Sequence, residues 1–108
     1  MGMKVTRTAG DGGVRITVAG EVDIDSAPKM RQALDAALAV GDPIVVDLAA
    51  VTFMDSSGLS VLIAAHLRAR DRGLELRLRD VPSRVAALLR VSGLDNVLVI
   101  ADPSDPGN

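Results

Sequence analysis

The chain contains no cysteine, which excludes disulfide bonds, zinc held by cysteines and thiol catalysis together. It contains one histidine, His66, and a single imidazole is too little for a histidine-based metal site. We therefore expect neither a metal ion nor another cofactor.

Aromatic residues are almost absent, since Phe53 is the only one. The core must therefore be built from valine, leucine, isoleucine, alanine and methionine. The net charge of -2 comes from acids and bases that are mixed along the chain, so the one-sided basic field that attracts a phosphate backbone is missing. Because side chains that stack on bases are also lacking, we expect no nucleic-acid partner.

Long apolar runs are missing as well. Residues 1–10 include Lys4 and Arg7 but no apolar stretch of signal-peptide length, and no run reaches the roughly eighteen apolar residues of a membrane span. We expect a soluble, cytoplasmic protein with no direct insertion into a membrane.

Its 108 residues, 48% of them hydrophobic, suit one compact domain. We place that domain at 1–101 and expect 102–108, with two prolines, a glycine and two acids, to be a disordered tail.

The first half of the chain predicts a hairpin followed by a helix. Residues 3–8 and 14–18 have strand-like patterns, and the Asp-Gly pair between them is a strong hairpin signal. We expect Gly20 to end the second strand. Ser26, or the aspartate before it, can cap a helix that ends near Gly41.

The second half alternates strands with helices. The apolar, β-branched run at 44–48 predicts a strand that is covered on both faces, and we place it at the centre of a sheet. The remaining predicted elements are a helix from the serine pair at 56–57 to Gly73, a strand at 74–79, a helix from Pro82 to about Gly93 and a strand at 97–100.

The predicted order of elements is ββαβαβαβ. Strands that alternate with helices usually lie parallel and adjacent, with right-handed crossovers. The sequence thus predicts an α/β fold in which helices pack on a small mixed β-sheet of about 4–5 strands.

Three segments carry a resemblance to a known family. They are Val-Thr-Phe-Met-Asp-Ser-Ser-Gly-Leu at 51–59, Gly-Glu-Val-Asp at 20–23 and Ser-Gly-Leu at 92–94. Their order and spacing resemble the STAS domain of anti-sigma factor antagonists over essentially the whole chain. Asp-Ser-Ser-Gly is short by itself, but its place between a buried strand and an apolar helix makes it specific.

The resemblance implies a function for the Asp-Ser-Ser-Gly motif. In this family the first serine of the motif is phosphorylated, which maps onto Ser56, with Ser57 as the fallback. The unmodified domain is implied to bind an anti-sigma factor serine kinase and so to release a sigma factor, whereas phosphorylation abolishes binding. A PP2C-type phosphatase is implied to restore the unmodified form. On this hypothesis the chain is a substrate and not an enzyme.

We expect the kinase to contact the starts of the first two helices and the turns before them. The expected contact residues are Asp23, Ser26, Asp55, Ser56, Ser57 and Gly58. A phosphate on Ser56 would lie at a helix start, where unpaired N–H groups tolerate negative charge. Inside an interface and beside Asp55, the same charge would bring repulsion and desolvation. We therefore expect a binding switch with little change of fold.

Most of these residues also have a structural interpretation. Asp55 or Ser56 can act as a helix cap. Asp23 can be a turn residue that bonds its own backbone, and Gly58 can relieve crowding at the helix start.

Two other functions compete with the antagonist hypothesis. The first is a stand-alone STAS subunit of a lipid-transport ABC complex, where similar domains dock on an ATPase. The second is a hydrolase that uses Ser56. It has no base within reach, because His66 lies ten residues further along the same predicted helix, about 15 Å along its axis.

Overall fold

The computed structural model describes residues 2–10 and 12–100. The predicted disordered tail at 102–108 lies outside these residues. The elements are β1 (Met3–Gly10), β2 (Gly13–Val22), α1 (Ala27–Val40), β3 (Ile44–Met54), α2 (Ser56–Asp71), β4 (Leu76–Arg79), α3 (Ser83–Val91), the 3-10 helix η1 (Leu94–Asn96) and β5 (Val99–Ile100).

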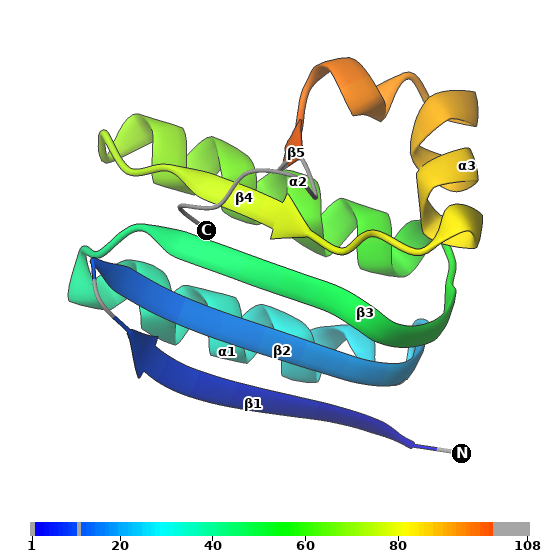
Figure 1. Cartoon of the computed structure of the whole chain (residues 1–108), viewed down its shortest axis with the longest axis horizontal. Helices are drawn as coiled ribbons and strands as arrows, with labels where there is room; N and C mark the ends of the chain where they lie inside the picture. The colour runs from blue at the N-terminus through cyan, green and yellow to red at the C-terminus, as the bar shows by residue number, and fades with distance from the viewer. Residues whose placement is uncertain (1, 11, 101–108) are drawn as a thin grey trace.

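The strands form one sheet in the order β1-β2-β3-β4-β5 (Figure 1). β1 is antiparallel to β2, and each later pair of neighbours is parallel. The predicted α/β fold with a mixed sheet is therefore confirmed. Because β2, β3 and β4 point the same way, their carboxyl ends meet at one edge of the sheet, and each of the three α-helices follows from that edge.

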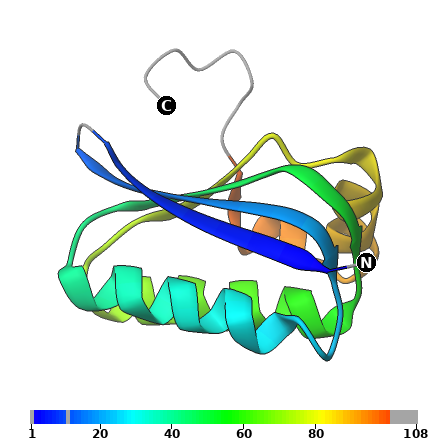
Figure 2. The same cartoon turned by 90° about the horizontal axis from the view of Figure 1, so that it is seen from below.

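The helices α1 and α2 lie side by side on one face of the sheet (Figure 2). Fully buried aliphatic side chains such as Ile16 and Val46 fill the space between the layers. Val45 and Asp47 alternate with the buried residues of β3 and are only half-buried, so the prediction that the strand at 44–48 is covered on both faces is wrong. The reason lies in the strand order. From β2 to β5 each new strand is added on the same side of the one before it, and right-handed crossovers that all run in one direction place their helices on one face of the sheet.

Gly20 does not end β2, contrary to the sequence prediction. Its φ of 94° lies in the left-handed region that glycine adopts readily, and a Cβ there would come within 2.4 Å of the Gly2 carbonyl oxygen. The ladder with β3 shifts its register between Gly20 and Glu21, as at a β-bulge. β2 thereby continues to Val22, which pairs with Met54 at the end of β3.

The other differences from the predicted elements concern lengths. β3 continues past the predicted 44–48 to Met54, whereas β4 has 4 residues and β5 has 2. β4 starts late because the Leu74 N–H donates to the Ala69 carbonyl oxygen at 2.8 Å and so belongs to the end of α2. η1 is not among the predicted elements. Within 2–10 and 12–100, no helix has the length and apolarity to cross a bilayer.

Candidate functional site

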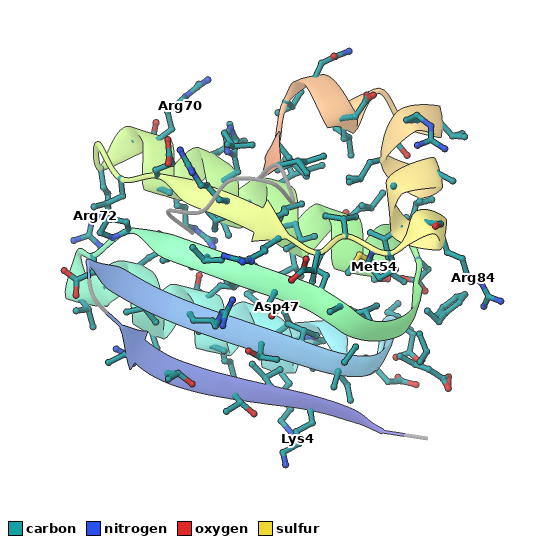
Figure 3. All side chains as sticks on the ribbon, viewed as in Figure 1. Lys4, Asp47, Met54, Arg70, Arg72 and Arg84 are labelled. Atoms are coloured by element: carbon teal, nitrogen blue, oxygen red, sulfur yellow. The ribbon has the colours of Figure 1, made fainter. Side chains whose placement is uncertain are left out.

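The predicted site residues lie where β2 and β3 end. Asp23 directly follows β2, and Asp55 directly follows β3. A hydrogen bond of 3.2 Å from the Asp55 N–H to the Val22 carbonyl oxygen joins the two segments. Met54 and Arg84 mark this end of the sheet in Figure 3. The structure thus brings together the two segments that the sequence analysis singled out, and we call this region the site edge, comprising residues 21–26 and 53–58.

Asp55 is the N-cap of α2. Its backbone is extended, with φ -107° and ψ -169°, and its Oδ1 accepts a hydrogen bond of 2.8 Å from the Ser57 N–H. Its carbonyl oxygen accepts the first helical bond, from the Leu59 N–H at 3.2 Å. These are the two contacts of an N-cap, so Asp55, one of the two capping candidates, is the residue that caps the helix.

Ser56 is the first residue of α2 and is exposed to solvent. Among the described residues its hydroxyl has no hydrogen-bond partner, while its carbonyl oxygen accepts a bond of 2.9 Å from the Ser60 hydroxyl. Ser57 is half-buried, and its N–H is occupied by Asp55. Of the two serines, Ser56 therefore presents the more accessible nucleophilic oxygen to another protein.

Asp23 and Ser26 close the turn before α1. Asp23 Oδ1 accepts from the N–H groups of Asp25 and Ser26, both at 3.0 Å, and Ser26 Oγ accepts from the Asp23 N–H at 3.0 Å. The Ser26 hydroxyl also lies 2.9 Å from the Glu21 carbonyl oxygen and 3.1 Å from Asp23 Oδ1, and its one hydrogen is shared between them. Ser26 stands at the N-cap position of α1, as one of the two predicted candidates, but its hydroxyl bonds back into the turn and caps no N–H of the helix.

The Ser26 backbone N–H and hydroxyl hold the pKa of Asp23 below its ordinary value, because both stabilise the charged carboxylate. Asp23 is therefore ionised at neutral pH, and its carboxylate is committed to the turn. The geometry favours the structural interpretation of Asp23 over a surface charge that is free to meet a partner. Its contact with a kinase remains a prediction.

Gly58 is buried at the start of α2. A Cβ at this position would lie 2.6 Å from Met54 Cγ and 2.9 Å from Val22 Cγ1. The glycine thus allows the helix to begin directly against the ends of β2 and β3, as the crowding interpretation proposes. Its contact with a partner also remains a prediction.

The side chains of the site edge carry only negative formal charge. The acids are Glu21, Asp23, Asp25 and Asp55, and no lysine or arginine occurs at 21–26 or 53–58. Arg68 and Arg70 of α2 and Arg72 just after it lie at the other end of the helix, where Arg70 and Arg72 are labelled in Figure 3. Arg68 there forms an ion pair of 2.7 Å with Asp35 of α1. Arg68 and Arg72, which donates to the Leu38 carbonyl oxygen at 2.5 Å, therefore link the two helices. All three arginines lie too far along the chain from Ser56 to offset a charge placed there.

Two side chains of the site edge were not singled out by sequence reasoning. Ile24 is 74% exposed and Phe53 is 49% exposed. The available signal was that the only aromatic residue of the chain stands three positions before Ser56. Sequence patterns placed Phe53 on the strand before the motif and gave no sign that its side chain is exposed.

The described residues do not assemble a hydrolytic or metal site around Ser56. His66 lies near the middle of α2, ten residues after Ser56 and about 15 Å away along the helix axis. Within 2–10 and 12–100, no group of three or more potential metal ligands occurs. What the site edge offers is an exposed serine hydroxyl at the start of a helix.

Comparison with known proteins identifies the family. The family described as "Mlab, STAS domain" matches residues 5–100. The anti-sigma-B factor antagonist of Listeria monocytogenes is 36% identical over 88 residues, which is 81% of this chain and 77% of that protein. The anti-sigma-B factor antagonist of Bacillus subtilis is 28% identical over 107 residues, which is 99% of this chain and 98% of that protein.

The solved structures agree with the sequence comparison. The crystal structure of an anti-sigma factor antagonist from Mycobacterium paratuberculosis matches with a TM-score of 0.76 and 30% identity, covering 91% of this chain and 84% of that one. The matched residues 5–100 include the whole site edge and nearly the entire sheet. The resemblance inferred from the sequence is thereby confirmed, and the chain belongs to the STAS domain family.

Proposed function

We propose that this protein is an anti-sigma factor antagonist controlled by phosphorylation of Ser56. The relatives from Listeria monocytogenes and Bacillus subtilis bear the name anti-sigma-B factor antagonist, and they are similar along most or all of the chain. In this proposal the unmodified domain binds an anti-sigma factor serine kinase and frees a sigma factor. It acts in the cytoplasm, as a substrate and not as a catalyst.

The observation that carries the proposal is the state of Ser56. Its side chain is exposed at the first position of α2, and within the described residues its hydroxyl makes no hydrogen bond. A serine that served only as a cap would bond a backbone N–H of the first turn, and Asp55 already does so. The hydroxyl of Ser56 therefore has no structural task that phosphorylation would interrupt.

The proposed modification is a phosphoryl transfer from ATP bound to the kinase. Ser56 Oγ attacks the γ-phosphorus, the Oγ–P bond forms, and the bond from that phosphorus to the bridging oxygen of ADP breaks. A basic group of the kinase takes the hydroxyl proton, and ADP leaves. In the reverse branch, a PP2C-type phosphatase uses water to cleave the Oγ–P bond and returns inorganic phosphate and the serine.

The charge balance of the site edge explains how the modification would release the kinase. A phosphate adds about -1.5 to -2 charge next to the carboxylate of Asp55, on segments with no basic side chain. The positive end of α2 offsets this by only about 0.3–1 kcal/mol at an exposed helix start. Changing a complex from almost fully bound to almost fully free requires about 5.5 kcal/mol of differential affinity. Repulsion and desolvation in the interface have to supply that difference.

The decisive experiment incubates the protein with each purified anti-sigma factor kinase of the source organism and ATP, followed by location of phosphate by mass spectrometry. We expect phosphate on Ser56, none in Ser56→Ala, and normal modification in Ser57→Ala. Phosphate confined to sites other than Ser56 and Ser57, or no phosphate with any kinase, would contradict the proposal.

A binding measurement separates this function from the lipid-transport alternative. We expect Ser56→Ala to bind the kinase and to remain bound in the presence of ATP, whereas Ser56→Asp binds weakly. Stable association with a transport ATPase that is unaffected by Ser56→Asp would instead favour a subunit of an ABC complex.

A further inference from the structure

Two large apolar side chains are exposed on the site edge of a protein that otherwise buries most of its apolar residues. Ile24 is 74% exposed in the turn between β2 and α1, and Phe53 is 49% exposed near the end of β3. Single exposed apolar residues are common on protein surfaces and need no explanation. These two, however, stand on the two segments that frame Ser56.

The ladder between β2 and β3 fixes the positions of the two residues. Phe53 pairs with Glu21, and Val22 pairs with Met54. Val22 and Met54 are buried toward the helices, so their neighbours Glu21 and Phe53 face the other side of the sheet. Phe53 therefore stands on the open face at its carboxyl-terminal edge.

Ile24 lies beyond the same edge, in a turn whose backbone is held in place. The turn is closed by the bonds of the Asp23 carboxylate to the N–H groups of Asp25 and Ser26. An exposed side chain on a rigid turn loses little conformational freedom of the backbone when a partner covers it. The backbone around Ile24 is thus already ordered before a partner binds.

Both residues are within the area that a partner on Ser56 must cover. Phe53 is three residues from Ser56, at most about 11 Å along the chain, and Ile24 is within roughly 14 Å by way of the bond between Asp55 and Val22. A standard interface buries about 800 Å² on each partner, which corresponds to a patch with a radius of about 16 Å. An interface of that size centred on Ser56 includes both side chains.

We propose that Ile24 and Phe53 form an apolar pair that anchors the kinase on this protein. The inference rests on the proposed function and adds the chemistry of the partner: a kinase whose surface beside its catalytic centre offers an apolar pocket or groove. The apolar pair supplies the binding contact, in keeping with the apolar centre that protein interfaces have inside a polar rim. Phosphorylation of Ser56 then weakens the complex without changing the two apolar side chains that make the contact.

The test measures the steady-state kinetics of phosphorylation by the cognate kinase, together with the Kd of the complex, for Ile24→Ser and Phe53→Ser. The control is Val40→Ser, because Val40 is 54% exposed at the end of α1, next to the opposite edge of the sheet. We expect each anchor variant to raise KM and Kd by about tenfold with kcat nearly unchanged, and the control to match the wild type.

A conservative variant and a thermal melt separate docking from folding. Phe53→Leu keeps an apolar side chain and is expected to recover most of the lost affinity. Ile24→Ser is expected to retain the melting temperature of the wild type, because its side chain has few contacts to lose. If Phe53→Ser unfolds, the result for Ile24→Ser decides the inference by itself.

The possible outcomes distinguish the inference from the function on which it rests. A wild type that is phosphorylated on Ser56, with KM and Kd of both anchor variants equal to those of Val40→Ser, overturns the apolar pair and leaves the proposed function standing. A change in kcat without a change in KM also contradicts docking. A wild type that no anti-sigma factor kinase binds or modifies overturns both.

Discussion

Two aspartates organise the site edge at the scale of single residues. Asp23 and Asp55 each follow a strand and accept a hydrogen bond from the N–H two positions later, that of Asp25 or Ser57. The same local contact thus closes the turn before α1 and caps the start of α2. Ser56 is held in position by its neighbours and not by its own side chain.

The Asp23 carboxylate makes stability depend on pH. Its folded pKa is lowered by the Ser26 N–H and hydroxyl, whereas in the unfolded chain it is ordinary, about 3.9. The stabilisation is therefore fully present above about pH 4 and is lost as the pH falls through the lower folded value. Asp23→Asn keeps an acceptor but has no such titration. We expect urea unfolding to give a larger stability difference between wild type and Asp23→Asn at pH 7 than at pH 3; an equal difference at both would contradict this.

The two serines at the helix starts should respond differently to removal of the hydroxyl. The Ser26 hydroxyl contacts three groups in the turn, so Ser26→Ala should lower the free energy of unfolding by about 1–2 kcal/mol. Ser56→Ala removes a hydroxyl without a partner in the described part of the chain and should change it by less than about 0.5 kcal/mol. Chemical denaturation of the two variants measures both changes in the free energy of unfolding. Unfolding of Ser56→Ala would mean that the serine has a structural role.

At the scale of elements, the start of α2 depends on a missing side chain. Alanine in place of glycine usually stabilises a helix by about 1 kcal/mol. Here the added Cβ would lie 2.6 Å from Met54 Cγ and 2.9 Å from Val22 Cγ1, and such overpacking costs about 1–3 kcal/mol. We expect Gly58→Ala to destabilise the protein. In a Met54→Ala background the same substitution should cost less, and a double-mutant cycle from denaturation curves measures the difference.

Most elements could be predicted from the sequence because their signals are local. The alternation in residues 14–18 and the helix start at the serine pair depend on neighbours in the chain, and both are found in the structure. Gly20 shows the limit of this reasoning. Glycine is compatible with both a strand end and a bulge, and only the pairing with β3 decides for the bulge. The open face of the sheet likewise depends on strand order, which no local pattern contains.

The candidate site was predictable to a similar degree. Asp55 and Ser56 stand in a motif whose spacing identifies a helix start, and the structure places them there. The sequence could not show whether the Asp23 carboxylate is committed to the turn, because that depends on its bonds to Ser26, which only the structure gives. Exposure of Ile24 could not be read from an apolar residue between two aspartates, because an apolar side chain is by default expected in the core.

At the scale of the whole molecule, the distribution of charge makes the switch sensitive to salt. Ser56→Asp adds a negative charge to the site edge, and Ser60→Asp adds the same charge one helical turn further along α2 on an exposed position. The screening length falls from about 10 Å at 0.1 M salt to about 3 Å at 1 M. We expect Ser56→Asp to weaken kinase binding more than Ser60→Asp, with the gap narrowing as salt rises. Equal effects of the two variants in titration calorimetry would argue against a local charge mechanism.

The half-exposed position of Phe53 has an optical consequence. The chain contains no tryptophan and no tyrosine, so the protein has almost no intrinsic fluorescence of its own. Phe53→Trp would introduce one fluorophore, located on the site edge and already 49% exposed at the native residue. Its emission would report burial by a partner without any attached dye, because no other residue of this chain would contribute to it.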